Sequence, residues 1–118
     1  MTQEERQLLI KDLCARFPYG VICRLSVKEA DVSITDNLEI GGLVHFIYGT
    51  MNVEPYLRPM SSMTEEEIDR MWEIYESGPA AESSVAVAEY LYERHLDCHY
   101  LIEKGLALEA PEGMYKIE

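Results

Sequence analysis

The amino-acid sequence predicts an α+β fold: an N-terminal helix, a small antiparallel sheet or SH3-like barrel of three to five strands, and then two to three C-terminal helices. The chain has 118 residues, which fits a single domain. Apolar residues recur at helical intervals near the start and in the second half, and alternate with polar residues between 19 and 34. We therefore expect a helix at 2–16, a β region at 19–54, a connector at 55–63, a helical part at 64–105 and a tail at 106–118.

The first helix has a clear start and a clear end. Thr2 and Glu5 have the spacing of a capping box, in which each side chain satisfies a free backbone N–H of the other residue. Pro18 disfavours a helical residue before it, so the helix is expected to end near Arg16. The apolar residues at helical intervals are Leu9, Ile10, Leu13, Cys14 and Phe17.

The β region is expected to begin with a hairpin. Apolar and polar residues alternate over 19–27 and again over 30–34, as they do on strands with one buried face. Residues 43–48 are apolar or aromatic on both faces apart from His45, which predicts a central strand or a barrel strand. One more strand is expected at 51–53, because Pro55 lacks the N–H that a strand ladder needs.

The second helix has the clearest start signal in the chain. Thr64 and Glu67 have capping-box spacing, and Met63 and Ile68 are placed as a hydrophobic staple. The Ser-Gly-Pro sequence at 77–79 is typical of a helix end. We therefore expect this helix to fill the interval between these signals.

A third helix is expected to start at a cap formed by Ser83 or Ser84, and Asp97 is placed to cap a short fourth one. Gly105 is positioned as the left-handed residue that ends a helix. Four large apolar residues of the helical part are expected to pack toward the core: Trp72, Tyr75, Leu91 and Leu101.

The charge of the chain excludes one class of partner. The sequence has 22 acidic and 10 basic residues, a net charge of -12, and residues 63–118 hold fourteen acids against four bases. Because nucleic-acid affinity comes largely from Lys and Arg, we expect no direct DNA or RNA binding. The longest charge-free stretch, 40–53, has 14 residues and is too short to span a membrane.

The cysteines and the N-terminus predict a cytoplasmic protein. Cys14, Cys23 and Cys98 are odd in number and have no CxxC spacing, so a disulfide framework is not expected. The first residues show no basic region followed by an apolar run, the pattern of a secretory signal.

One group of residues suggests metal or nucleophile chemistry. His95, Cys98 and His99 include the ligand types that zinc prefers, at a spacing that lets two of them share a helical face. A structural zinc site needs four ligands, and the remaining candidates, such as His45, lie far away in sequence. We predict no catalytic residue, cofactor or metal site, and a small enzyme or metal-binding protein that uses these residues is the alternative.

The predicted partner-binding residues lie in the helical part. Glu65, Asp69, Glu73 and Glu76 follow one side of the second helix, and the last two lie near its negative end, where acids are unfavourable. This pattern indicates either a solvated face that keeps the protein soluble or a contact for a partner with a basic surface. Tyrosines are enriched at interfaces, which adds two candidate contacts, Tyr90 and Tyr92.

Three stretches of the sequence are specific enough to suggest relatives. They are LCARFPYGVI at 13–22, PYLRPMSSMTEEE at 55–67 and LIEKGLALEAPEGMY at 101–115, about a third of the chain. In these stretches the chain resembles a family of small proteins from gut Bacteroidales genomes and their prophages. The resemblance implies a single cytoplasmic domain encoded on phage or mobile DNA, and it implies no activity, cofactor or catalytic residue.

Together these features predict a non-catalytic interaction protein of phage or mobile-element origin. Its acidic helical face would dock on a basic surface of a host or phage protein, and in a sharper version its carboxylates would imitate the phosphates of a nucleic acid. We expect no membrane partner. A structural homo-oligomer that uses the tyrosine-rich helices as its interface is a further alternative.

Overall fold

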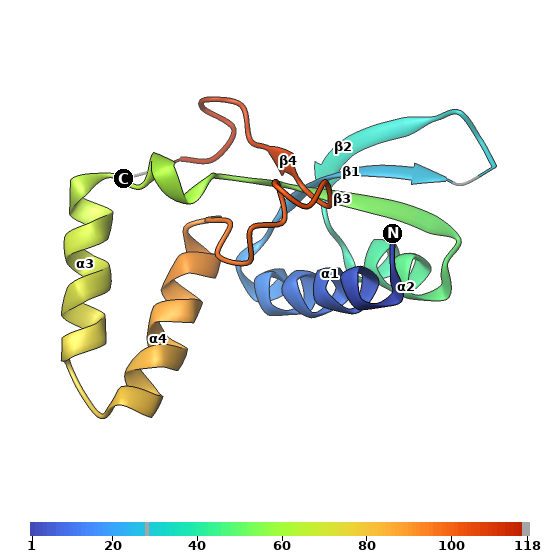
Figure 1. Cartoon of the computed structure of the whole chain (residues 1–118). Helices are drawn as coiled ribbons and strands as arrows, with labels where there is room; N and C mark the ends of the chain where they lie inside the picture. The colour runs from blue at the N-terminus through green and yellow to red at the C-terminus, as the bar shows by residue number, and fades with distance from the viewer. Residues whose placement is uncertain (28, 117–118) are drawn as a thin grey trace.

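The computed structural model describes residues 1–27 and 29–116 and has the predicted α+β class. Figure 1 shows two parts: a body in which a sheet covers α1 and α2, and a hairpin of α3 and α4 that projects from one end of the body. The helices are α1 (Gln3–Arg16), α2 (Ile40–Tyr48), α3 (Glu65–Glu76) and α4 (Ala80–Glu93), with short 3-10 turns η1 (Phe17–Tyr19) and η2 (Met60–Ser62). The strands are β1 (Ile22–Val27), β2 (Ser33–Asn37), β3 (Met51–Leu57) and β4 (Leu108–Glu109).

The sheet is open and mixed, in the order β2-β1-β3-β4. The first three strands are antiparallel and include the predicted hairpin, whereas β4 runs parallel to β3. The predicted antiparallel sheet is present as β2-β1-β3, and the short parallel strand β4 at its edge was not predicted. The strand that sequence reasoning missed has only two residues, too few for an alternating pattern.

Residues 43–48 form most of α2, so the prediction of a strand there is wrong. An apolar run that is buried on two sides has the same composition in a strand and in a helix. The signal that separates the two is Gly49, which ends α2 in the left-handed region with a φ of 86°. Arg6 also stabilises the end of α2, because its guanidinium donates to the carbonyls of Phe46 and Ile47.

Pro55 lies inside β3 and does not end it. The strand continues to Leu57, whose carbonyl accepts from the backbone N–H of Ala110 on the side away from β1. Alternate residues direct their backbone groups to the same side of a strand, so the Pro55 nitrogen also faces away from β1. No ladder bond is lost, because β4 begins its pairing only at Tyr56.

The hydrophobic core lies in the body, between the sheet, α1, α2 and the C-terminal segment. Within the described residues, the buried cluster and the apolar side chains packed against it include none from α3 or α4. Leu91 is buried outside this cluster, while Trp72 and Tyr75 are 52% and 49% exposed. The predicted packing of Trp72 and Tyr75 toward the core is therefore wrong, whereas Leu91 is buried and Leu101 lies in the core cluster as predicted. The core residues are Leu9, Leu13, Val21, Cys23, Leu38, Leu43, Phe46, Val53, Leu57, Leu101, Leu106 and Ala107.

The predicted helix caps are confirmed in two places and corrected in two others. Both capping boxes form, at Thr2 and at Thr64. The third helix starts earlier than predicted, with Pro79 as its N-cap, and the Ser83 hydroxyl donates back to a carbonyl of the preceding turn. The Asp97 carboxylate accepts backbone N–H groups as a cap does, but the residues after it form turns and no helix.

The end of this turn segment is as expected. Gly105 has a φ of 74°, which a side chain would strain. The backbone N–H of Leu106 donates to the Leu101 carbonyl over 2.9 Å, and both side chains lie in the core.

Candidate functional site

Three charged side chains join the helical hairpin to the body, and we call them the Arg58 junction: Arg58, Glu67 and Arg94. The Arg58 guanidinium donates to both carboxylate oxygens of Glu67, over 2.7 and 2.8 Å. Arg94 Nε donates to the same carboxylate over 2.9 Å. Only 2% of Glu67 is exposed, so this bidentate pair is sheltered from water.

The backbone around the junction is equally well bonded. Arg58 follows β3 directly, and its N–H and C=O bond to His95 and Asp97 over 2.8 Å each. The bonds from Arg58 hold the pKa of Glu67 far below its usual range, at about 2, with a further contribution from the Thr64 backbone N–H. The pairing of Arg58 with Glu67 fixes where α3 leaves the body.

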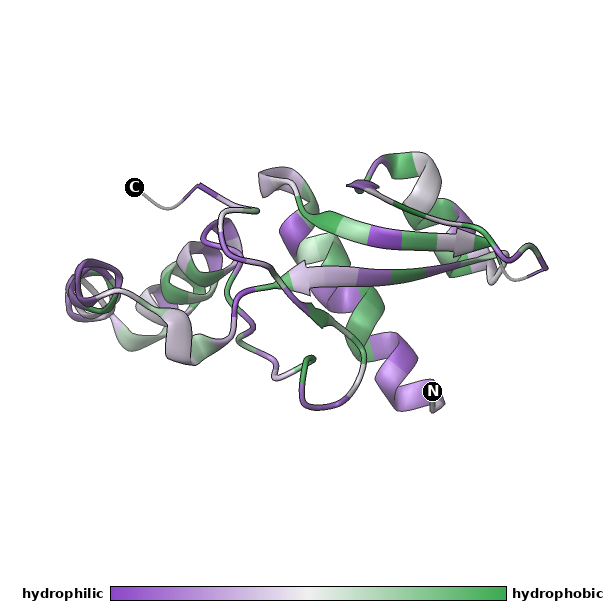
Figure 2. Cartoon of the chain, turned by 90° about the horizontal axis from the view of Figure 1, so that it is seen from above, coloured by the Kyte–Doolittle hydropathy of each residue, from purple (hydrophilic) through white to green (hydrophobic). Residues whose placement is uncertain are grey.

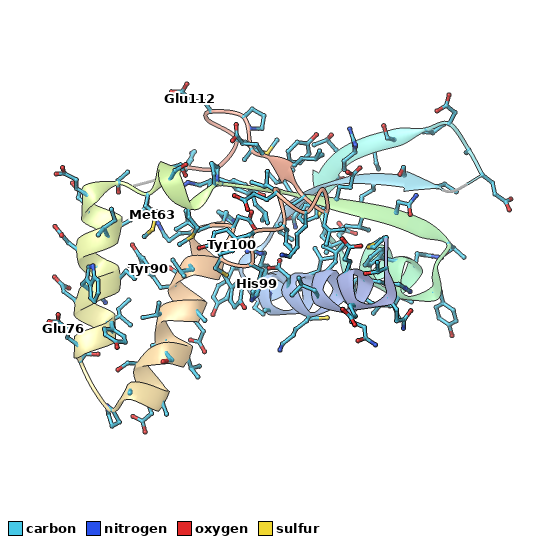
Figure 3. The ribbon with its side chains drawn as sticks, in the orientation of Figure 1. Met63, Glu76, Tyr90, His99, Tyr100 and Glu112 are labelled. Atoms are coloured by element: carbon cyan, nitrogen blue, oxygen red, sulfur yellow. The ribbon has the colours of Figure 1, made fainter. Side chains whose placement is uncertain are left out.

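The four carboxylates of the predicted acidic stripe lie on α3 and are all exposed: Glu65, Asp69, Glu73 and Glu76. Glu73 pairs with Arg70 over 3.0 Å, a surface contact of little strength because both side chains are mostly in water. Figure 3 shows Glu76 on the outer side of α3, away from α4. The stripe therefore faces solvent along the outer side of the hairpin.

An apolar groove borders the acidic stripe, and we call it the Trp72 groove. It is a shallow hollow of about 220 Å³ lined by Met71, Trp72, Tyr75 and Val87. The rings of Trp72 and Tyr75 meet edge to face, with centroids 5.7 Å apart. Two large aromatic side chains thus stay half in water beside a row of carboxylates.

Tyr90 and Tyr92, the other predicted partner contacts, make contacts within the chain. Figure 3 shows Tyr90 between α3 and α4, and burial raises the pKa of its hydroxyl. Tyr92 is half-buried beneath the Arg16 guanidinium, which lies 5.2 Å from the ring centroid. Sequence reasoning missed the Trp72 groove, because an apolar stripe that includes a Trp is usually read as core.

His99 belongs to a buried polar cluster between α1 and the C-terminal turns. Its Nδ1 lies 2.7 Å from Asp12 Oδ2, and Asp12 also accepts from Arg16 Nε over 2.6 Å. Asp12 and Arg16 are fully buried, and Arg16 donates as well to the Leu96 carbonyl. These bonds tie α1 to the segment after α4, and the signal in the sequence was an acid and a base four residues apart.

The other residues of the suggested metal site lie in different surroundings. His95 stacks on Tyr115 with ring centroids 3.7 Å apart, and His45 faces Thr50 at the end of α2. Burial raises the pKa of the Cys98 thiol, which opposes a nucleophilic thiolate. Within the described residues, no group of three or more His, Cys, Asp or Glu side chains is placed to hold a metal ion.

No protein-family model, curated protein or solved structure matches this chain. In the part of the chain that the structure describes, none of the helices combines the length and the apolar character needed to cross a bilayer. The function is therefore inferred from the geometry of the chain itself.

Proposed function

We propose that this is a non-catalytic protein-protein interaction protein whose helical hairpin docks on a basic surface of a partner protein. The observation that carries the proposal is the Trp72 groove: two aromatic rings about half exposed beside an acidic stripe, on a hairpin that adds nothing to the described core. Buried aromatic side chains surrounded by a polar rim are the usual centre of a protein interface.

The shape of the molecule supports this proposal. The hairpin projects from the body in Figure 1, so a partner reaches α3 without contact with the sheet. The chain extends over 48 × 30 × 24 Å, with a radius of gyration of 15.0 Å. That radius exceeds the roughly 13.5 Å expected for a compact domain of this length. A projecting element with exposed aromatic residues is more useful for binding than for stability.

The charge of the hairpin supports a basic partner. Residues 63–118 hold most of the net charge of -12, and the acidic stripe lies beside the Trp72 groove. Carboxylates around an apolar contact speed the encounter with a positive surface and reject a negative one. The sharper form of the proposal is a nucleic-acid mimic, in which the stripe occupies the phosphate-binding surface of a DNA- or RNA-binding protein.

The protein is proposed to act in the cytoplasm of a host cell. The three cysteines are free, as reduced thiols are in that compartment. The resemblance to proteins of Bacteroidales genomes and prophages adds a phage or mobile-element origin, which makes a host protein the expected partner.

The test compares two variants with the same change in charge. The first replaces the stripe (Asp69→Lys, Glu73→Lys, Glu76→Lys), and the matched control replaces three exposed acids of α4 (Glu82→Lys, Glu89→Lys, Glu93→Lys). Tagged protein is used to capture partners from host lysate at low and high salt, and captured proteins are identified and purified. We expect a basic or nucleic-acid-binding protein that is lost with the stripe variant and with Trp72→Gln, and kept with the α4 control.

Binding of the purified partner is then measured directly. Screening acts over about 8 Å at physiological ionic strength, so affinity should fall steeply as salt rises. A mimic should also be displaced by duplex DNA or RNA. The proposal fails if the captured protein binds both charge variants equally, or if its affinity does not change with salt.

A further inference from the structure

The helix α2 is apolar on the side that faces away from the core as well as on the side that faces it. Leu43 and Phe46 are buried against the sheet. Four other apolar side chains fall on one outer face of the helix, at spacings of three, four and eight residues. They are Ile40, Val44, Ile47 and Tyr48, with exposed fractions of 61%, 43%, 46% and 83%.

The neighbouring β-hairpin is also apolar on its helix side. Leu25 pairs with Ile34 across the hairpin, and opposed residues of an antiparallel pair share a face. A side chain at Gly42 of α2 would meet Leu25, so this is the face that carries α2. Three side chains of this face extend beyond the helix and are exposed: Val27, Val32 and Ile34, at 46%, 62% and 56%.

These two sets form one surface, the α2 patch, which consists of Val27, Val32, Ile34, Ile40, Val44, Ile47 and Tyr48. A hollow lined by Val27, Glu29, Gly49 and Thr50 joins the end of β1 to the end of α2. From their exposed fractions, the seven side chains present on the order of 800 Å² to solvent. That total includes backbone atoms and the Tyr48 hydroxyl, and it is about as large as one side of a standard interface.

The geometry points to a second copy of this chain as the occupant of the α2 patch. In Figure 1 the patch elements lie at the opposite end of the molecule from α3, so two copies that meet through α2 keep their acidic hairpins far apart. Residues 40–48 contain no Asp, Glu, Lys or Arg. On a chain with a net charge of -12, two copies repel each other less at this helix than at α3, and the carboxylate of Glu29 lies at the edge of the patch.

Other occupants fit the patch less well. An interfacial membrane helix normally carries Lys or Arg on its polar face, and α2 has neither. Figure 2 shows α2 mainly in the hydrophobic colour and α3 mainly in the hydrophilic one, so a basic partner of α3 finds no matching carboxylates on α2. Because α2 itself has no Asp, Glu, Lys or Arg, it can face its own copy across a two-fold axis without charge conflict along the helix.

This dimer interface lies at the opposite end of the molecule from the tyrosine-rich helices, which the sequence had suggested as an oligomer interface. Two hairpins at the outer ends of a dimer offer two Trp72 grooves, so a partner with two basic sites is bound with an avidity gain. The inference is independent of the proposed function, since α2 and α3 lie in separate parts of the structure.

The test measures molar mass over a range of protein concentrations, by sedimentation velocity and by light scattering after size-exclusion chromatography. The wild-type protein is expected to approach twice the chain mass of 13.6 kDa. The variant Val44→Lys with Tyr48→Lys places four like charges at the two-fold interface, and lysine near the end of a helix is compatible with the helix dipole. We expect its dimer dissociation constant to rise by roughly 100-fold.

The matched control is Trp72→Gln on the helical hairpin, which should leave the mass unchanged. Circular dichroism checks that both variants keep the wild-type helix content. The inference is overturned if the wild-type protein stays monomeric at several hundred micromolar. It is also overturned if the α2 variant dimerises as the wild type does, or if Trp72→Gln abolishes the dimer.

Discussion

The body and the helical hairpin are stabilised by different kinds of contact. The body buries an apolar cluster to which α1, the sheet, α2 and the C-terminal segment all contribute. The hairpin adds no described residue to that cluster and is joined to the body largely by polar contacts: the Arg58 junction and the packing of Tyr92 on Arg16. Apolar burial is non-directional and tolerates small shifts, whereas a buried ion pair depends on geometry and protonation.

This difference implies that the two parts respond differently to mutation and to acid. A change in the body core should lower the stability of both parts, because β3 contributes Val53 and Leu57 to the core and leads directly into Arg58. A change at the junction should release the hairpin first. The single Trp of the chain, Trp72, lies on the hairpin and reports on that part alone by fluorescence.

The largest expected effect is that of Leu57→Ala. Leu57 is fully buried at the end of β3, and its truncation leaves a cavity that costs about 2–5 kcal/mol. Because Arg58 is the next residue, we expect Trp72 fluorescence and circular dichroism to lose stability together in urea. Val85→Ala, at a side chain of α4 that is 60% exposed, serves as the matched control and should change little. If the urea midpoint measured by Trp72 fluorescence is unchanged in Leu57→Ala, the hairpin does not depend on the body core.

The next effect is that of Glu67→Gln. The substitution keeps the size of the side chain but leaves the Arg58 guanidinium buried without its counter-charge, which costs about 3 kcal/mol. We expect the Trp72 transition to move to lower urea, while hydrogen exchange of β1 and β3 amides remains close to wild type. A shift in the Trp72 transition without a change in hydrogen exchange would show that the hairpin unfolds separately from the body.

Glu66→Gln is the control for this variant, because Glu66 is exposed and adjacent in sequence. It should change stability by no more than about 0.5 kcal/mol. If Glu67→Gln shifts both probes equally, the hairpin and the body unfold as one unit, which would contradict a separate stabilisation of the two parts.

Acid should weaken the same junction. The pKa of Glu67 in the folded protein is lowered from 4.5 to about 2 by its bonds to Arg58. A depressed pKa gives stability that is complete above pH 4.5 and is lost as the pH falls through about 2, a total of about 3 kcal/mol. Trp72 fluorescence in urea at stepwise lower pH should show this loss in the wild type. Glu67→Gln should lack it, and a retained slope would assign the loss to another carboxylate.

Local signals along the chain predicted the starts of α1 and α3 and the β-hairpin well. The capping boxes at Thr2 and Thr64 act within one helical turn, so their geometry depends on few other residues. The same holds for Gly105, whose left-handed backbone follows from its own lack of a side chain. The carboxylates of the acidic stripe were also placed correctly on one exposed helix face.

The sequence-based predictions fail where contacts with distant parts of the chain determine secondary structure or burial. Residues 43–48 are apolar enough for either a strand or a helix, and their packing beneath the sheet, together with the left-handed Gly49 that follows them, selects the helix. Trp72 has the spacing of a core residue, and its exposure follows from the projection of the hairpin away from the body. The buried Glu67 resembles its two exposed neighbours in sequence, and Arg58, nine residues before it, determines the difference.

His95 should make the body sensitive to milder acid than the hairpin. Burial lowers the pKa of His95 from 6.5 to about 4, and its buried Nδ1 has no hydrogen-bond partner among the described residues. The stabilisation is therefore complete above pH 6.5 and is lost as the pH falls through about 4, a total of about 3 kcal/mol, of which roughly 2 kcal/mol is lost between pH 7 and pH 5. Urea unfolding followed by hydrogen exchange of β1 amides at pH 7 and pH 5 measures this loss.

The variant His95→Asn isolates this effect. His95 has a positive φ of 62°, a backbone conformation that Asn tolerates better than most residues. The His95→Asn variant should be less stable than the wild type at pH 7, because the stacking on Tyr115 is lost. Its stability should vary less between pH 7 and pH 5. Equal slopes in the two proteins would show that the body senses acid elsewhere.

The smallest effect on stability is expected at the residue with the largest proposed effect on binding. Trp72→Gln removes a side chain that is 52% exposed and contacts Tyr75 edge to face, so it should cost about 1 kcal/mol. A core aromatic of the same size costs about 3–5 kcal/mol when truncated. Circular dichroism in urea measures the difference, because the variant has no tryptophan signal. A loss of about 3 kcal/mol would mean that Trp72 supports the hairpin itself, and the groove would then be a structural contact with no free surface for a partner.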